Sequence, residues 1–219
     1  MQPILRLIED ILANGAAVEL PSFPRIIFIV HGTVMIAGRP FGHGEAWHGE
    51  AEISLHAGPE GATCWRFELG AERSGDGAVE VGGVTSREKI SARLETLPKG
   101  DLIMRGDSVA FPPGGCAYLH RHQGPGIRCL IEGGIRIDTC GRSTSYGPGG
   151  AWFENGPDPV FAQAAADRPS RFIRTLILPH ALMGRSSIEY LNTEDRHKPR
   201  SQQYKVLVDA PIKWRPALP

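Results

Sequence analysis

The sequence predicts an all-β protein, folded as a sandwich or barrel with frequent turns. Its 219 residues include 27 glycines and 18 prolines, which interrupt many short runs of β-branched residues. Short strands separated by Gly and Pro turns are typical of all-β sandwiches and barrels. An internal repeat is the second observation, and it divides the chain into two similar β modules.

Charge and composition restrict the possible partners. Lys and Arg together number 24, and Asp and Glu together also number 24. Such a balance provides no basic field for nucleic acid and no polybasic face for an anionic membrane. The four cysteines form no CxxC pair, no apolar run is long enough to span a bilayer, and the N-terminus lacks a signal-peptide pattern. We therefore expect a reduced, cytoplasmic protein with a small-molecule ligand.

The expected elements follow in chain order. Apolar residues recur at helical spacing from Ile4 to Leu12, and Gly15 provides a stop, so the sequence predicts a short N-terminal amphipathic helix. Strands are predicted at 25–30, 33–37, 52–56 and 63–69, with Gly-rich turns between them. A polar helix is predicted at 86–95, and the segment 98–101 that follows it is the expected module boundary.

The repeat relates the two halves of the chain. The segment 26–36 resembles 127–137, and 42–47 resembles 147–152. Each copy contains a strand, a Gly turn, a second strand, another Gly turn and an Ala-Trp pair. This pattern predicts two modules, 1–100 with the leading helix and 101–219.

Two histidines in the second module are separated by one residue. Alternation along the predicted strand places the imidazoles of His120 and His122 on one face, together with Cys116 and Tyr118. Imidazole is a common ligand of zinc, iron, copper and nickel. The spacing therefore predicts half of a metal coordination shell.

A third ligand is needed, because two histidines rarely hold a metal alone. Glu154 is the main candidate, since it shares a strand face with Trp152 and would complete a set of two histidines and one carboxylate. Alternatively, Glu154 is an exposed residue before the turn at Asn155. Gln163 is a weaker candidate.

Arg128 has two interpretations. If Gly126 points inward, so does Arg128, and its guanidinium would select carboxylate or phosphate groups. If Ile127 and Cys129 point inward instead, Arg128 is an ordinary solvated residue, and this second interpretation is the one we expect. The candidate substrate-binding residues are Tyr118, Arg128, Trp152 and Gln163.

The histidine pair lies in a frame of glycines that resembles the first motif of the cupin superfamily. Gly114, His120, His122 and Gly133 match the spacing of that motif, whereas Gly126 stands where the family has a glutamate ligand. In the alternative register Ile127 takes that position. The histidine of the second family motif is also absent. The resemblance covers residues 102–180 well and 20–70 weakly, as in a two-domain cupin with a degenerate first copy.

The resemblance implies a double-stranded β-helix, a jelly-roll barrel with a ligand cavity. It also implies a divalent metal ion, namely iron, manganese, zinc or nickel. Our first hypothesis is a metal-dependent enzyme of the oxygenase or isomerase type that acts on a small organic molecule. The alternatives are a non-catalytic binder or sensor that has lost the metal, and a storage-like oligomer. The predicted strand at 204–209 completes a sheet or exchanges with a second subunit, so we expect a homodimer.

Overall fold

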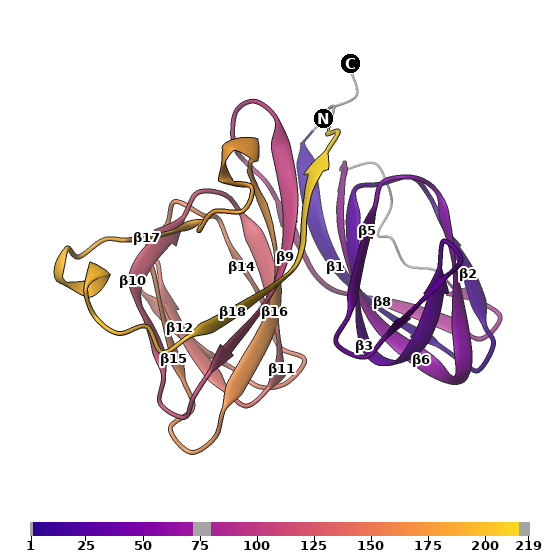
Figure 1. The fold of residues 1–219 in the computed structure, drawn as a ribbon, viewed down its shortest axis with the longest axis horizontal. Helices are drawn as coiled ribbons and strands as arrows, with labels where there is room; N and C mark the ends of the chain where they lie inside the picture. The colour runs from indigo at the N-terminus through magenta and orange to yellow at the C-terminus, as the bar shows by residue number, and fades with distance from the viewer. Residues whose placement is uncertain (1, 72–79, 215–219) are drawn as a thin grey trace. The chain divides into compact units, whose positions relative to one another are not determined.

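The computed structural model describes residues 2–71 and 80–214, and these form antiparallel β-sheets (Figure 1). The chain divides into two compact units, one of Met1–Glu95 with Ile212–Pro219, the other of Thr96–Pro211. Within the described ranges the only helices are two short 3-10 turns, η1 (His180–Leu182) and η2 (Glu194–Arg196). Neither is long and apolar enough to cross a membrane. The all-β prediction is therefore confirmed.

The first unit is built around one eight-stranded sheet. Its strands run in the order β4-β3-β6-β1-β8-β7, with β2 paired to β6 and β5 paired to β3. The predicted strands at 25–30 and 33–37 are parts of the single long strand β3, and those at 52–56 and 63–69 fall largely within β6. The bounds are β1 Pro3–Leu12, β2 Ala17–Leu20, β3 Arg25–Ile36, β4 Arg39–Gly42, β5 Ala46–Gly49, β6 Ile53–Ala71, β7 Glu80–Val81 and β8 Val84–Arg93.

The predicted N-terminal helix is wrong, because residues 3–12 form strand β1. This strand lies inside the sheet between β6 and β8. Leu5, Leu7 and Ile8 are all fully buried, so both faces of the strand are covered. A strand buried on both faces does not alternate, and its apolar residues can then mimic helical spacing.

The predicted helix at 86–95 is also wrong, since most of this segment belongs to strand β8. β8 pairs with β1 along its length. Arg87 and Lys89 on β8 place their side-chain nitrogens 2.9 and 3.4 Å from the carboxylate of Glu9 on β1. Pairing with a distant strand thus overrides the helical preference of the local residues.

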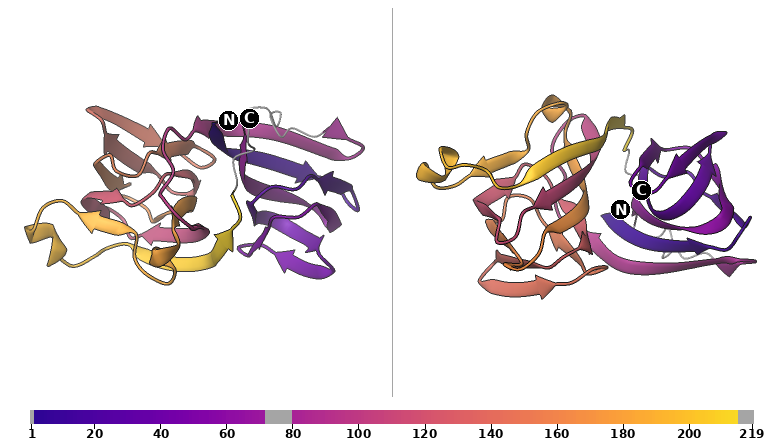
Figure 2. Two further views of the ribbon diagram at one scale, coloured as in Figure 1. Left: turned by 90° about the horizontal axis from the view of Figure 1, so that it is seen from above. Right: turned by 60° about the horizontal axis from the view of Figure 1, so that its bottom comes forward.

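The second unit contains two five-stranded sheets, which the views in Figure 2 show from two sides. Their orders are β13-β12-β15-β10-β17 and β14-β11-β16-β9-β18. Side chains of both sheets share one core, with Val109 and Phe172 from one sheet and Ile137 and Ala162 from the other. The bounds are β9 Leu102–Phe111, β10 Cys116–His122, β11 Gly126–Glu132, β12 Ile135–Thr139, β13 Arg142–Tyr146, β14 Ala151–Glu154, β15 Val160–Ala164, β16 Ser170–Pro179, β17 Ile188–Tyr190 and β18 Gln203–Ile212.

The last strand completes a sheet within the chain. β18 includes the strand predicted at 204–209 and lies beside β9, at the edge of the second five-stranded sheet. Of the two expected roles for this segment, the structure therefore contains the first, in which the strand covers an open sheet edge.

Candidate functional site

Charged residues form a row across the second sheet of the C-terminal unit. Arg128 on β11 pairs directly with Trp152 on β14 and with Arg174 on β16, and Arg174 pairs with Asp107 on β9. Directly paired residues of neighbouring strands share a face of the sheet. All four side chains are buried. The register of four strands therefore places two arginines and one aspartate side by side inside the unit.

The histidine pair approaches this row from the other sheet. His120 and His122 on β10 are both buried, and their ring centroids lie 4.9 Å apart. Between the sheets is a cavity of about 20 Å³, which is lined by both histidines and by Arg128, Glu154 and Arg174. That volume accommodates roughly one water molecule. We call this space the inner cavity.

Arg128 and Glu154 meet at the wall of the inner cavity. Nη2 of Arg128 lies 2.6 Å from Oε2 of Glu154, and Nη1 donates a hydrogen bond to the carbonyl of Gly126 at 2.7 Å. The two paired atoms are at ion-pair distance but are not aligned as a hydrogen bond, and each lacks a hydrogen-bond partner among the described residues. The second oxygen of Glu154 accepts a hydrogen bond from Nε1 of Trp152 at 2.9 Å.

This geometry settles two alternatives that the sequence left open. The solvated interpretation of Arg128 is wrong, because its side chain is only 1 % exposed and burial lowers its pKa to about 10. Ile127 and Cys129 on the opposite face of β11 are buried as well. Both faces of β11 are therefore buried, and alternation in the sequence could not show whether Arg128 or its neighbours Ile127 and Cys129 face the inner cavity. Glu154 is not an exposed turn residue either, since its side chain is 10 % exposed.

Arg174 lies between Asp107 and His122. Its Nε and Nη2 donate hydrogen bonds to Oδ2 of Asp107 at 2.9 and 2.8 Å, and its Nη1 lies 3.4 Å from Nε2 of His122. A guanidinium can only donate, so Nε2 of His122 is an acceptor and the ring proton lies on Nδ1, 3.3 Å from Ser187 Oγ. Burial first, and then the charges of Arg174 and Arg128, hold the pKa of His122 well below 6.5. His122 is therefore neutral.

His120 is held in one tautomer by the backbone. Its Nδ1 lies 2.7 Å from the carbonyl oxygen of Tyr118, which can only accept, so Nδ1 carries the proton. Burial lowers the pKa of His120, while the nearby charge of Glu154 opposes this effect. Both histidines are thus neutral bases beside two buried arginines.

Two of the candidate substrate-binding residues lie away from the inner cavity. The pairing of β10 with β15 shifts register between Ala117 and His120, so Ala117 and not Tyr118 lines the cavity. The ring of Tyr118 instead lies 4.9 Å from Nζ of Lys198. Gln163 donates a hydrogen bond to the carbonyl of Gly114 at 2.7 Å. A β-bulge of this kind breaks the strict alternation from which Tyr118 was placed beside the histidines.

Arg174 and Asp107 are the main residues that sequence reasoning missed. Each is a charge within a long and largely apolar strand. A charge in such a strand is a signal of a buried partner, because an unpaired buried charge is costly. Their pairing is set by the register of β9 and β16, which no local pattern reveals.

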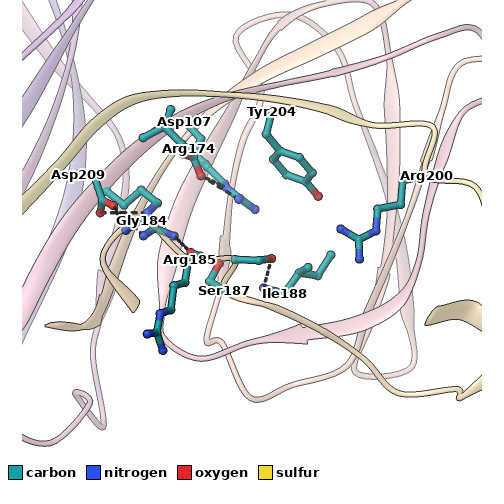
Figure 3. A pocket seen from close by; sticks show the side chains of 12 residues that line it. Asp107, Arg174, Gly184, Arg185, Ser187, Ile188, Arg200, Tyr204 and Asp209 are labelled. Carbon is teal, nitrogen blue, oxygen red and sulfur yellow. Dashed lines mark hydrogen bonds and ion pairs between the residues drawn. The ribbon is translucent and has the colours of Figure 1, made fainter. Parts of the chain in front are cut away.

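A larger pocket adjoins the inner cavity. It measures about 370 Å³, and Figure 3 shows the side chains that surround it. Arg174 and Tyr204 line both spaces. Further lining comes from the segment 184–188 before and at the start of β17, and from β18. We call this space the outer pocket.

In the first unit, the position that corresponds to Arg128 has apolar surroundings. In the sequence repeat Ile27 takes the position of Arg128, and Ile27 pairs with Trp47 just as Arg128 pairs with Trp152. Ile27 belongs to the apolar core of its unit, and Trp47 packs against that core. The combination of buried arginine and histidine pair is therefore a feature of the second unit.

Comparison with known proteins shows which fold the chain has. No protein-family model matches the sequence, and no curated protein matches it. Three structures of oxalate decarboxylase from Bacillus subtilis do match: a Trp-to-Tyr variant (TM-score 0.63, 15 % identity), an Arg-to-Ala variant (0.61, 16 %) and the enzyme at pH 4.6 (0.62, 15 %). Each match covers 89 % of this chain and 72 to 73 % of the other. The chain has a two-module cupin fold.

The residues that line the inner cavity do not fit a divalent metal. Another matching structure of the same enzyme concerns its Mn(II) centres. In the present chain, no group of three or more His, Cys, Asp and Glu within 2–71 and 80–214 is arranged to hold a metal ion. Arg174 donates toward Nε2 of His122, and Arg128 occupies one oxygen of Glu154. Guanidinium groups thus face two of the three predicted ligands, His122 and Glu154.

Proposed function

We propose that the C-terminal module binds a small organic anion without a metal ion. This is the second of the two main hypotheses drawn from the sequence, a small-molecule binder that has lost the metal. The observation that carries the proposal is the 3.4 Å approach of Arg174 Nη1 to Nε2 of His122. An arginine there supplies a fixed positive charge in place of a metal ion.

The electrostatics of the inner cavity favour an anion. Burial first, and then the charges of Arg174 and Arg128, lower the pKa of His122, so these two guanidinium groups act on the ring as positive charges. Guanidinium groups bind carboxylates through paired, charge-assisted hydrogen bonds. Since the inner cavity holds only about one water, a ligand would occupy the outer pocket, which Arg174 also lines, and its acid group would lie near the arginines of that pocket.

The matched structures are compatible with this ligand class. They are of an oxalate decarboxylase, an enzyme named for a carboxylate. At 15 to 16 % identity the likeness supports the fold alone. The proposal of an anionic ligand is therefore based on the arginines of this chain.

Metal content and anion binding test the proposal together. Full-length protein without a histidine tag, produced with iron, manganese, nickel and zinc in the medium, is expected to contain far less than one metal ion per chain. Isothermal titration with a panel of small carboxylates is expected to detect binding that Arg174→Gln weakens about 10-fold or more. Stoichiometric metal that disappears in His120→Ala/His122→Ala would overturn the proposal.

Two further variants keep this test decisive. Arg174→Gln leaves Asp107 buried without its partner, so Arg174→Gln/Asp107→Asn serves as the variant in which neither charge remains. Arg168→Gln removes an exposed arginine whose side chain is 62 % exposed, and it is expected to leave anion binding unchanged. The proposal would also be overturned if Arg174→Gln and Arg174→Gln/Asp107→Asn bound carboxylates as tightly as the unmodified protein and Arg168→Gln.

A further inference from the structure

We infer that the outer pocket binds a carboxylic acid with an apolar body, whose acid group is held by Arg200. The inference rests on the proposed function and names the class of anion. Oxalate, the acid in the name of the matched enzyme, has no apolar body and does not belong to this class.

The wall of the outer pocket exposes large apolar side chains. Four large hydrophobic residues are exposed within the described part of the chain, and the two in the second unit are Tyr204 and Val206, at 41 % and 56 %. Both line this pocket, together with Ile188. Exposed apolar side chains that gather in a hollow indicate a binding surface. A ligand with an apolar body would cover them.

Arg200 provides an uncommitted positive charge at this pocket. Its guanidinium lies 5.5 Å from the ring centroid of Tyr190, and no ion pair joins it to a described carboxylate. An arginine that rests on an aromatic face retains N–H groups along its edge for an anion. In Figure 3 the guanidinium of Arg200 and the hydroxyl of Tyr204 point into the same space.

The other arginines that line the outer pocket either form hydrogen bonds within the protein or point away from Tyr204 and Arg200. Arg105 forms two hydrogen bonds to Asp209 at 3.0 and 2.9 Å and also donates to the carbonyls of Arg185 and Leu182. Arg174 is held by Asp107. Figure 3 shows the side chain of Arg185 extending away from Tyr204 and Arg200. Arg200 is therefore the residue placed to receive the acid group of a ligand in this pocket.

The size of the pocket agrees with this class of ligand. Its volume of about 370 Å³ lies within the range of roughly 300 to 1,000 Å³ that is common for small-molecule sites. A two-carbon dicarboxylate would leave most of this space, and the side chains of Tyr204 and Val206, in water.

The experiment compares matched ligands on the full chain. Phenylacetate, 3-phenylpropionate and 4-phenylbutyrate are titrated by ligand-observed NMR and calorimetry, alongside the neutral alcohol 3-phenylpropan-1-ol and oxalate. At least one aryl acid is expected to bind about 10-fold or more tightly than the alcohol and than oxalate. Arg200→Gln is expected to weaken that binding about 10- to 100-fold, whereas Arg168→Gln leaves it unchanged.

Val206→Asp supplies a second readout, because it places a negative charge on the exposed apolar wall without altering a buried residue. It is expected to abolish aryl-acid binding. The inference is overturned if the alcohol or oxalate binds as tightly as every aryl acid, or if neither Arg200→Gln nor Val206→Asp weakens binding. Small carboxylates that bind through Arg174 while aryl acids do not would overturn the inference and leave the proposed function standing. Stoichiometric metal would instead overturn the proposed function.

Discussion

Arg128 and Glu154 form a buried ion pair across neighbouring strands, with Nη2 and Oε2 2.6 Å apart. Glu154 lies directly opposite Gly126 on β11, and Arg128 follows Gly126 by two residues on the same face. The positive charge that faces this carboxylate thus comes from the protein itself. The pair therefore gives Glu154 a counter-charge from a side chain of the neighbouring strand.

Glu154→Gln is expected to lower the free energy of unfolding by about 3–5 kcal/mol, because it leaves the guanidinium of Arg128 buried without its counter-charge. Chemical denaturation measures the loss. Arg128→Met/Glu154→Gln is the control, since it removes both charges and should regain most of the stability. A double variant as unstable as the single one would contradict the assigned role of the pair. If Glu154 were a metal ligand, the single variant would instead lose bound metal.

Gly126→Ala is expected to destabilise the protein by about 1–3 kcal/mol through overpacking. A Cβ at this position would lie 2.4 Å from the carbonyl oxygen of Thr175 and 2.6 Å from Cδ2 of Leu176. Gly147→Ala is the matched control, because a Cβ there meets nothing within 4 Å. Equal stability of the two variants would refute the crowding at Gly126. The same crowding predicts that Gly126→Glu, which restores the glutamate of the family motif, does not create a metal site.

The stability of the protein is expected to rise as the pH increases toward 6.5 and to level off above it. Burial lowers the pKa of His120, His122 and His48 below 6.5, so below that pH the unfolded chain binds more protons than the folded one. Each such histidine contributes up to about 1.4 kcal/mol per pH unit in this window. Denaturation curves at several pH values measure the slope. His120→Gln/His122→Gln should reduce the slope more than His48→Gln, and an unchanged slope would contradict the assignment.

Asp10→Asn is expected to destabilise the first unit by about 1.5–3 kcal/mol, because Asp10 is fully buried and accepts hydrogen bonds from Arg66 at 2.7 and 3.0 Å. The neighbouring Glu9→Gln is a matched control. Glu9 pairs with Arg87, whose side chain is 71 % exposed, and more loosely with Lys89 at 3.4 Å, and pairs near the surface contribute about 1 kcal/mol or less each. Thermal unfolding of the two variants provides the comparison. A greater loss of stability in Glu9→Gln than in Asp10→Asn would show that burial of the carboxylate does not determine the size of the loss.

Part of the fold follows from local patterns. The strand runs before and after Gly32, the repeat that aligns Ile27 with Arg128, and the placement of His120 and His122 on one face are properties of alternation and turns. The same rules failed for β1, where both faces are covered, and for Tyr118, where a bulge shifts the register. In both cases a partner distant in the sequence changes the periodicity.

The all-β class, the two related modules and the paired histidines are consequences of residue types and their spacing, because alternation and turn formation act within a few residues. The positive charges beside those histidines are the guanidinium groups of Arg128 and Arg174, and strand pairing places them there. Arg128 is two residues from Gly126 in sequence, but Arg174 and Asp107 reach the same row only through the register of β11, β16 and β9. That register is non-local, and so is the burial that makes both histidines neutral. The tertiary structure therefore places two buried arginines beside the histidine pair that the sequence predicts.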